Sequence, residues 1–301
     1  MKLIDWIDRG TRQLDTAGVA FGHGTQNAFD ESVWLSLWQL GLALDTELTD
    51  DAISERVLTP GELDALQILF KRRIESRKPT AYLTQEAWLQ GVPFYVDERV
   101  IIPRSLIAEV LVNGSIDPWL SQDTHKVLDL CTGNGSLAIL AAMEFPDVLV
   151  CASDLSTAAL EVAQINLEKH GLVSRVALVQ SDGLKAEELT ALGPFDLILC
   201  NPPYVNAFSM SELPEEYKAE PALALDGNSA GGTDGMDFIR MLLAKAPLHL
   251  SDIGILVLEI GHERDNFDAA FPLLEGIWMP TSAGEDQVVV LNCHELKKIY
   301  L

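Results

Sequence analysis

The chain has 301 residues, of which 48% are apolar, so it can bury the core of one large domain or two smaller ones. No apolar run reaches the roughly 18 residues of a membrane-spanning helix, and acidic residues interrupt the first apolar stretch, which argues against a signal peptide. The formal net charge is −24, and residues 96–301, with 12 basic against 31 acidic side chains, hold −19 of it. Such a field repels nucleic acid and favours a basic partner, although an acidic surface also serves solubility alone.

The four cysteines are widely spaced and form no metal-binding pair, and the six histidines form no zinc pattern. Three of the cysteines lie at or beside predicted strands, so we expect small buried thiols in a reducing cytoplasm and no bound metal. The cysteines are Cys131, Cys151, Cys200 and Cys293.

Residues 1–90 are predicted to form a helical domain. A first helix is expected from about residue 2 to residue 15, and Asp30 is expected to cap a second. Thr59-Pro60-Gly61-Glu62 is a capping-box pattern that opens a third helix. A basic cluster follows near the end of that helix, where cations suit the helix dipole, and a nucleic-acid contact is the alternative interpretation. The cluster is Lys71, Arg72, Arg73, Arg77 and Lys78.

Residues 82–102 are rich in Val, Ile, Phe and Tyr and contain Gly91-Val92-Pro93, so they are predicted to form a β-hairpin or an extended linker. A helix is expected at 106–112. We therefore place a hairpin and linker at 91–118 and a second domain at 119–301.

From residue 125 onward, apolar runs of strand length alternate with stretches of helical periodicity. Strands are expected at 125–130, 148–153, 175–181, 195–200, 253–260 and 287–293, with a weaker one at 276–279. Helices are expected at 136–145, 156–170, 235–249 and 263–273. This alternation predicts an α/β fold with a mainly parallel sheet and helices on both faces.

The first of these strands ends in a glycine-rich turn that opens a helix. In Cys131-Thr132-Gly133-Asn134-Gly135, the glycines allow ligand atoms to approach the backbone closely. The spacing differs from the GxGxxG dinucleotide fingerprint. Asp129 places a carboxylate before the turn, where it would repel a pyrophosphate but would suit a cationic ligand with an amino acid tail.

Polar residues also end the next two strands. Asp154, followed by Leu155, comes 19 residues after Gly135, at the distance expected for a carboxylate that binds ribose hydroxyls. Asp182, followed by Gly183, ends the third strand and can accept a hydrogen bond from an adenine amino group. Either Asp alone could be a helix cap or a turn residue, but together the strand ends predict a ligand site.

Asn201-Pro202-Pro203-Tyr204 follows the fourth strand. Two prolines fix φ twice and remove two amide donors, leaving carbonyl oxygens, an Asn amide oxygen and an aromatic face. These groups suit a planar group that carries an NH2, although an ordinary turn uses the same residue types. Asn201, Pro202 and Tyr204 are therefore the candidate catalytic residues, and the whole tetrapeptide is the candidate substrate-binding turn.

With these residues in place, the chain resembles the class I S-adenosylmethionine-dependent methyltransferases, and more closely the HemK-type protein-(glutamine) methyltransferases, over nearly its whole length. Besides the two turns, the resemblance rests on Tyr82 to Thr84, Gly91 to Val96, Ile102 to Arg104, Glu220 to Leu225 and Gly232 to Gly235.

The resemblance implies a seven-stranded Rossmann-like sheet with an antiparallel strand near its carboxyl end, preceded by a hairpin and a small helical domain that recognises the substrate. It implies S-adenosylmethionine as the cofactor, with Asp129 and Gly133 near its amino acid part. Asp154 would bind the ribose and Asp182 would lie near the adenine.

Within this family, Ile102-Pro103-Arg104-Ser105 and Cys131 resemble the branch that methylates a glutamine of ribosomal protein L-three of the large subunit. The branch that acts on peptide release factors continues differently after Arg104, and remains an alternative substrate class. A further alternative is an adenine or guanine amino methyltransferase that acts on nucleic acid. The acidic charge opposes this alternative, so direct nucleic-acid binding is not expected. A non-catalytic assembly factor that binds a basic ribosomal protein is the alternative from another class.

The segment 205–234 is long and acidic, and follows the candidate substrate-binding turn directly. It is expected either to close the site or contact a basic partner, or to be a plain surface excursion. Its acidic residues include Glu212, Glu215, Glu216 and Glu220.

Overall fold

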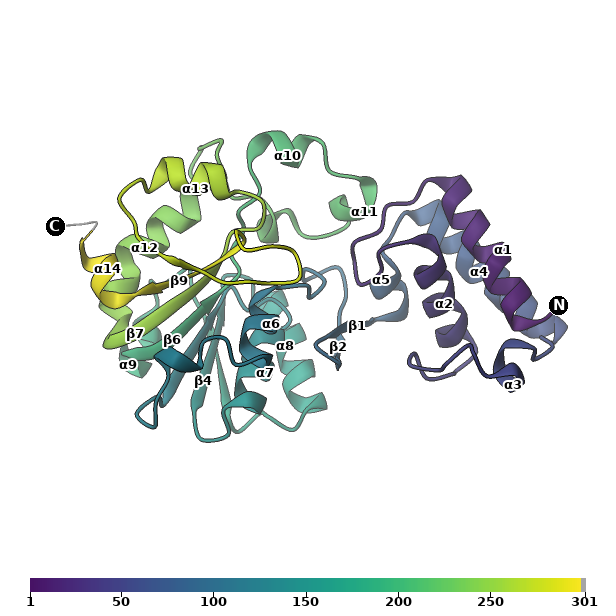
Figure 1. Cartoon of the computed structure of the whole chain (residues 1–301), viewed down its shortest axis with the longest axis horizontal. Helices are drawn as coiled ribbons and strands as arrows, with labels where there is room; N and C mark the ends of the chain where they lie inside the picture. The colour runs from purple at the N-terminus through teal and green to yellow at the C-terminus, as the bar shows by residue number, and fades with distance from the viewer. Residues whose placement is uncertain (299–301) are drawn as a thin grey trace. The chain divides into compact units, whose positions relative to one another are not determined.

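The computed structural model describes residues 1–298, and the chain divides into two compact units (Figure 1). The helical unit comprises Met1–Ala87 together with Leu213–Ala219, and the sheet unit comprises the rest of the chain. Within residues 1–298, no helix combines the length and the apolar character needed to span a lipid bilayer.

The helical unit packs its helices around an apolar core that includes Leu3, Trp6, Leu35, Leu66 and Phe70. The rings of Trp6 and Phe70 meet edge to face, with centroids 5.4 Å apart. Its helices are α1 (Leu3–Ala17), α2 (Ala28–Gln39), α3 (Asp51–Ser54), α4 (Pro60–Ser76), α5 (Thr80–Thr84) and α11 (Glu215–Lys218).

The ends of these helices confirm one predicted cap and correct another. The predicted capping box is present at the start of α4, where Thr59 accepts from the Glu62 backbone N–H and Glu62 accepts from that of Thr59. Asp30 does not cap α2, because that helix begins earlier and Asn27 accepts from the Asp30 backbone N–H at 2.9 Å. Residues 80–84 form α5, and not the extended chain predicted from residue 82 onward, because all five are buried and pack as a short helical turn.

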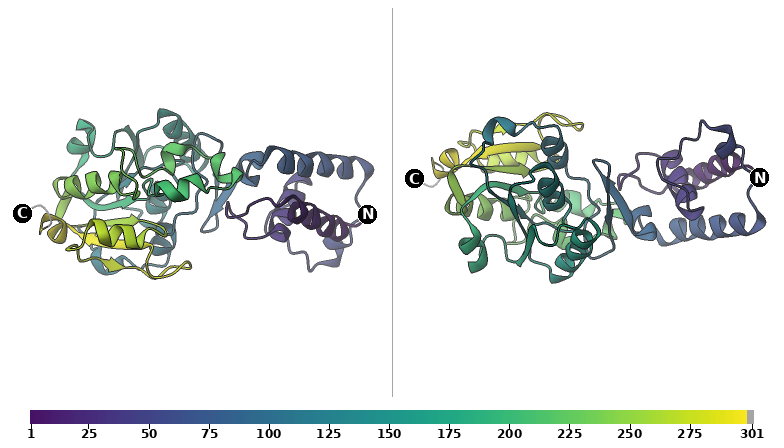
Figure 2. Two further views of the ribbon diagram at one scale, coloured as in Figure 1. Left: turned by 90° about the horizontal axis from the view of Figure 1, so that it is seen from above. Right: turned by 90° about the horizontal axis from the view of Figure 1, so that it is seen from below.

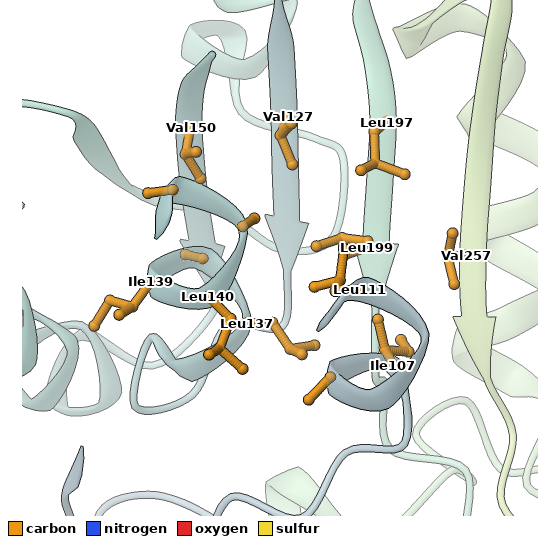
Figure 3. Close-up of a cluster of buried hydrophobic side chains, with 14 of the residues drawn as sticks. Ile107, Leu111, Val127, Leu137, Ile139, Leu140, Val150, Leu197, Leu199 and Val257 are labelled. Carbon is orange, nitrogen blue, oxygen red and sulfur yellow. The ribbon is translucent and has the colours of Figure 1, made fainter. Parts of the chain in front are cut away.

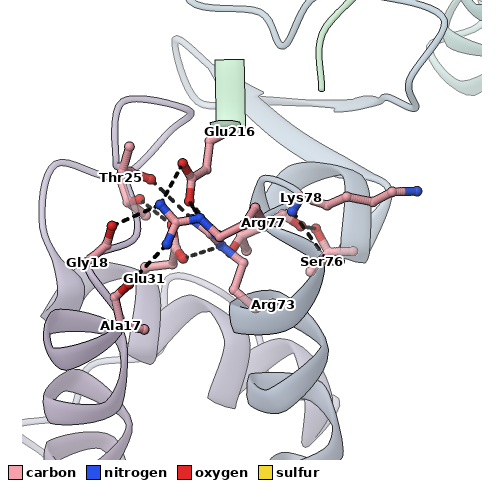
Figure 4. Close-up of polar contacts among 12 residues, drawn as sticks. Ala17, Gly18, Thr25, Glu31, Arg73, Ser76, Arg77, Lys78 and Glu216 are labelled. Carbon is pink, nitrogen blue, oxygen red and sulfur yellow. Dashed lines mark hydrogen bonds and ion pairs between the residues drawn. The ribbon is translucent and has the colours of Figure 1, made fainter. Parts of the chain in front are cut away.

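A buried ion-pair network lies inside the helical unit (Figure 4). Arg73, which is 0% exposed, donates from Nε to Glu31 at 2.7 Å and from Nη1 to Glu216 at 3.2 Å. Arg77 also donates to Glu216, at 3.1 Å, and to the carbonyl of Ala17 at 3.0 Å. Two members of the predicted basic cluster are thus internal partners of carboxylates. Glu216, expected in an acidic surface segment, is equally buried.

The sheet unit holds one seven-stranded sheet in the order β5-β4-β3-β6-β7-β9-β8 (Figure 1). Strands β3 to β7 pair in parallel, and β9 pairs antiparallel with both β7 and β8. This confirms the expected α/β fold, including its antiparallel strand. The strands are β3 (Lys126–Leu130), β4 (Leu149–Asp154), β5 (Val176–Gln180), β6 (Phe195–Cys200), β7 (Leu250–Glu259), β8 (Ile277–Trp278) and β9 (Val288–Asn292). A separate hairpin of β1 (Glu86–Leu89) and β2 (Val92–Tyr95) precedes the sheet.

Helices cover both faces of this sheet (Figure 2). Because side chains alternate along a strand, Val127 and Leu197 pack on one face against α6 and α7, while Leu128 and Ile198 pack on the other against α12 (Figure 3). The helices of the sheet unit are α6 (Ile107–Val112), α7 (Ser136–Glu144), α8 (Thr157–Lys169), α9 (Glu187–Leu192), α10 (Ala207–Ser211), α12 (Asp237–His249), α13 (Arg264–Ala270) and α14 (Cys293–Lys298), with 3-10 turns at Asp117–Trp119 and Ala222–Ala224.

The register of the parallel strands brings their carboxyl ends to one edge of the sheet. Leu130 at the end of β3 pairs with Ser153 of β4 and with Cys200 of β6, and Cys200 pairs with Leu258 of β7. This register therefore places three parts of the candidate site side by side: the glycine-rich turn, Asp154 and the Asn201–Tyr204 turn. They lie at the edge where open α/β sheets bind ligands.

Candidate active site

A cavity of about 430 Å³ opens at this edge of the sheet. Its walls come from the loop before α6, the turns after β3, β4, β5 and β6, the segment 221–230 and the first turns of α12. The lining residues are Arg99, Val100, Ile101, Leu130, Cys131, Gly133, Ser153, Asp154, Leu155, Ser156, Ala159, Ser181, Asp182, Gly183, Lys185, Asn201, Pro203, Pro221, Leu223, Ala224, Asp226, Ser229, Ala230, Asp237, Phe238 and Met241.

The structure brings most of the predicted cofactor residues to this cavity. The predicted residues that line it are Cys131, Gly133, Asp154, Leu155, Asp182, Gly183 and Asn201, together with Pro203 of the substrate-binding turn. The other predicted residues lie in the same two turns, or directly before them, without lining the cavity. They are Asp129, Thr132, Asn134, Gly135, Pro202 and Tyr204.

Asp129 lies in β3, beneath the glycine-rich turn, and is only 1% exposed. Its Oδ2 accepts from the Thr132 hydroxyl and, at 3.0 Å, from the backbone N–H of Ala138. Its Oδ1 is buried and has no hydrogen-bond partner among the described residues. Burial raises the pKa of Asp129 to about 7, although these two hydrogen bonds favour the ionised form. A cationic group brought to this carboxylate would satisfy the unpaired oxygen and restore the charge.

Cys131 adopts a left-handed backbone conformation, with φ of 62°. That conformation suits glycine, because a Cβ makes it costly. The Cys131 thiol is close to that of Cys200, and this contact together with burial raises the pKa of Cys131 well above its ordinary value. As expected, Cys151, Cys200 and Cys293 are buried, and all four cysteines are free.

Asp154 and Asp182 lie on the same cavity in different environments. The Asp154 carboxylate accepts from the backbone N–H groups of Gly133 and Ser156, both at 2.9 Å, and burial raises its pKa. Asp182 is exposed and forms an ion pair with Lys185. Each carboxylate oxygen has two lone pairs, so both residues keep the capacity to accept from a ligand.

The candidate substrate-binding turn presents two oxygens that have no hydrogen-bond partner within residues 1–298. Among the residues that the structure describes, none hydrogen-bonds to the Asn201 side chain or to the Pro202 carbonyl. Asn201 lines the cavity, and the Tyr204 hydroxyl donates to Glu259 at 3.3 Å. The turn therefore offers acceptors for an NH2 group beside the space for a ligand.

The sequence analysis did not single out the wall from Arg99 to Ile101, whereas the wall from residues 221–230 lies within the segment 205–234, for which closing the site was one of the expectations. Glu220, whose side chain is fully buried, joins these walls: it accepts from both Nη atoms of Arg104, at 2.7 and 2.8 Å, and from the backbone N–H of Ile102 at 2.9 Å. These residues do not follow predicted strands, and the sequence signals near them were the motifs Ile102–Arg104 and Glu220–Leu225. Two of the four acids expected to face a partner, Glu216 and Glu220, are thus internal.

The residues in and directly beneath the cavity have the chemistry that S-adenosylmethionine requires. The unpaired oxygen of Asp129 suits the ammonium of the amino acid tail, and Asp154 suits the ribose hydroxyls. Phe238 and Met241 supply an apolar wall beside Gly183, where a Cβ would lie 2.7 Å from the Met241 methyl carbon.

Comparisons with known proteins agree with this geometry. The family model described as "Methyltransferase small domain" matches residues 111–216. The ribosomal protein uL3 glutamine methyltransferase of Bordetella pertussis is 49% identical over 98% of this chain and 96% of the relative. The Burkholderia pseudomallei protein of the same name is 46% identical over 98% of this chain and 95% of its own length. The Neisseria gonorrhoeae one is 44% identical over 94% and 92%.

A similarity among solved structures supports the fold alone. The hMettl16 catalytic domain, solved in complex with the MAT2A 3′UTR hairpin 6, aligns with a TM-score of 0.50 at 13% identity. The alignment covers 77% of this chain and 80% of that one. At this identity only the arrangement of strands and helices is comparable.

Proposed function

The chain belongs to the family of ribosomal protein uL3 glutamine methyltransferases, and we propose that it methylates the side-chain amide nitrogen of a glutamine in ribosomal protein uL3. It is an S-adenosylmethionine-dependent methyltransferase with a class I fold. The observation that carries the substrate proposal is the turn after β6, where Asn201 and Pro202 present oxygens that no described residue hydrogen-bonds, at the edge of the donor cavity.

When bound, S-adenosylmethionine supplies a methyl group on a sulfonium centre that is open to in-line attack. The residues that would hold it are Asp129 at the ammonium, Asp154 at the ribose and Asp182 near the adenine. Gly133 and Leu155 line the cavity between these carboxylates.

An amide nitrogen is a poor nucleophile because its lone pair is delocalised into the carbonyl. In the proposed reaction, the glutamine NH2 donates one hydrogen bond to the Asn201 side-chain oxygen and one to the Pro202 carbonyl. These acceptors turn the nitrogen so that its lone pair faces the donor cavity, and they stabilise the positive charge that grows on nitrogen. Fixed dipoles aimed at developing charge contribute about 3–4 kcal/mol each, and orientation contributes roughly 7–11 kcal/mol.

The acceptor turn also gives the planar amide a surface to lie against, formed by Pro203 and the ring of Tyr204. We assign no general base. The proton is lost after the methyl group has been transferred, and water can accept it, because methylation makes the nitrogen strongly acidic.

The charge of the chain supports a basic protein as the partner. Residues 96–301 carry −19, which favours association with a cationic ribosomal protein and disfavours a phosphate backbone. As part of the same proposal, the helical unit recognises the protein substrate. The reaction takes place in the cytoplasm, and the free cysteines support that location.

Methyl transfer from labelled S-adenosylmethionine tests the proposal. The purified protein is offered ribosomal protein uL3, a peptide release factor and ribosomal RNA separately, and label is counted in each. We expect label in uL3, located on a glutamine by fragmentation mass spectrometry. Label that enters the release factor or the RNA in preference to uL3 would overturn the substrate assignment.

A further inference from the structure

Glu259, the last residue of β7, is a buried carboxylate with no role in the reaction proposed above. It is 4% exposed. Because β7 pairs in parallel with β6, with Leu258 opposite Cys200, Glu259 lies at the strand end beside the acceptor turn. A buried carboxylate is costly unless donors surround it, so its partners indicate what it stabilises.

Glu259 connects the start of α6 to the acceptor turn. Its Oε2 accepts from the Ser105 hydroxyl at 2.6 Å and from the Leu106 backbone N–H at 2.9 Å. Its Oε1 accepts from the Tyr204 hydroxyl at 3.3 Å. The two donors on Oε2 fix the carboxylate, and Oε1 in turn fixes the end of the Tyr204 side chain.

Close packing holds the ring of Tyr204 from a second side. Gly261, with φ of 53°, lies so near that a Cβ there would be 2.5 Å from the ring carbon Cε2 of Tyr204. Burial and the neighbouring Glu259 carboxylate raise the pKa of Tyr204 well above its ordinary value, so the hydroxyl remains a donor at physiological pH. The ring is thus held both at its hydroxyl and along its edge.

We propose that Glu259 is a positioning residue for methyl transfer: anchored by Ser105 and Leu106, it holds Tyr204 so that the target amide keeps its NH2 on Asn201 and Pro202. The inference rests on the proposed function and deepens it. Glu259 acts through Tyr204 and does not itself touch the donor or the acceptor. Its loss therefore lowers the rate of the chemical step without weakening donor binding.

A double-mutant cycle on turnover tests this role. The variants are Glu259→Gln, Tyr204→Phe and the double variant, each assayed with uL3 and labelled donor. Each single change is expected to lower kcat by about tenfold, the rate equivalent of one lost charge-assisted hydrogen bond, with KM for uL3 little changed. The double variant is expected to be no slower than the slower single variant, because both changes remove the same charge-assisted hydrogen bond. Multiplied losses in the double variant, or wild-type kcat in Glu259→Gln, would overturn the inference.

A matched control separates this role from general stability. Glu109 is also a carboxylate of the sheet unit that accepts from a serine hydroxyl and a backbone N–H, both of Ser282. Glu109→Gln should keep wild-type kcat. Calorimetric binding of S-adenosylhomocysteine and the thermal midpoint should be unchanged in Glu259→Gln, and a loss of either would assign Glu259 a structural role instead.

The outcomes also distinguish failure of this inference from failure of the proposed function. Wild-type turnover in Asn201→Ala contradicts the acceptor turn itself. Impaired turnover in Asn201→Ala together with wild-type kcat in Glu259→Gln contradicts only the positioning role.

Discussion

At the scale of single residues, the buried carboxylate of Asp129 lowers the stability of the donor-free fold but suits the binding of a cationic ligand. Its carboxylate has one buried oxygen without a partner among the described residues, and its folded-state pKa of about 7 lies above the ordinary value of 3.8. Between these two values, the folded protein keeps a proton that the unfolded chain has lost. The contribution of Asp129 to the free energy of unfolding of the donor-free protein therefore falls as pH rises from about 4 to about 7.

Replacing Asp129 by Asn removes this titration. We predict that the unfolding free energy of the donor-free Asp129→Asn variant falls less steeply between about pH 4 and pH 7, the summed difference from wild type being at most about 4 kcal/mol. Urea unfolding at a series of pH values measures it, with wild type as the reference. An unchanged slope in the variant would show that Asp129 titrates normally in the folded state.

The same carboxylate gives donor binding a pH dependence of opposite sign. A bound ammonium requires ionised Asp129, so binding below pH 7 must release a proton. We predict that affinity for S-adenosylhomocysteine weakens by up to about tenfold for each pH unit below about 7. Calorimetry at acid pH, in buffers of different ionisation heat, should detect about one released proton, and none with Asp129→Asn. Affinity that is independent of pH would remove Asp129 from the amino acid end of the site.

At the scale of elements, the segment around α11 belongs to the helical unit although it follows the acceptor turn in the sequence. Glu216 on α11 is fully buried against Arg73 and Arg77, which are 143 and 139 residues away in the sequence. Removing one partner of a buried ion pair leaves an uncompensated charge, which is more damaging than exchanging the whole pair.

We therefore predict that Glu216→Ala lowers the free energy of unfolding by about 3–5 kcal/mol. The neighbouring Glu215 is the matched control, since it is exposed and forms a surface ion pair with Lys218, and Glu215→Ala should leave the free energy of unfolding nearly unchanged. Denaturant unfolding followed by tryptophan fluorescence compares the two, because Trp6, Trp34 and Trp38 lie in the helical unit. Equal stabilities would contradict a structural role for the buried network.

Local patterns in the sequence predicted the elements well because they act over a few residues. The apolar run 195–200 gave β6 at its observed bounds, and the Thr59 capping box gave the start of α4. The predicted start of α2 was wrong because Asn and Asp are both favourable N-cap residues. Only the folded helix shows that Asn27, and not Asp30, is the cap. The internal roles of Glu216 and Glu220 could not be predicted, since their arginine partners are more than a hundred residues away.

The candidate site likewise contains residues that local sequence patterns predicted and residues that they did not. Asp154, Asp182 and Asn201 could be found because each follows a predicted strand, and the parallel sheet brings strand ends together. The cavity wall at Phe238 and Met241 lies on α12, inside an ordinary amphipathic pattern, so nothing in the sequence marks it. The roles of the predicted residues toward donor and substrate stay predictions that the variants test.

At the scale of the whole molecule, a net charge of −24 should steer a basic protein substrate. We predict that kcat/KM for uL3 falls severalfold as salt rises from about 0.05 to about 0.3 M, because the Debye length shortens over that range. The kcat at saturating uL3 should change little, since the chemical step is inside the sheet unit. A kcat/KM that is insensitive to salt would show that the charge serves solubility and not encounter with the substrate.

The central claim is that the turn Asn201–Tyr204 accepts the glutamine amide of uL3, and Asn201→Ala tests it most directly. Methyl transfer into uL3 and calorimetric binding of S-adenosylhomocysteine are measured on the same preparation of the variant. The account predicts turnover lowered by roughly a hundredfold or more, with donor affinity close to that of wild type. Turnover like that of wild type, with the same glutamine modified, would contradict it.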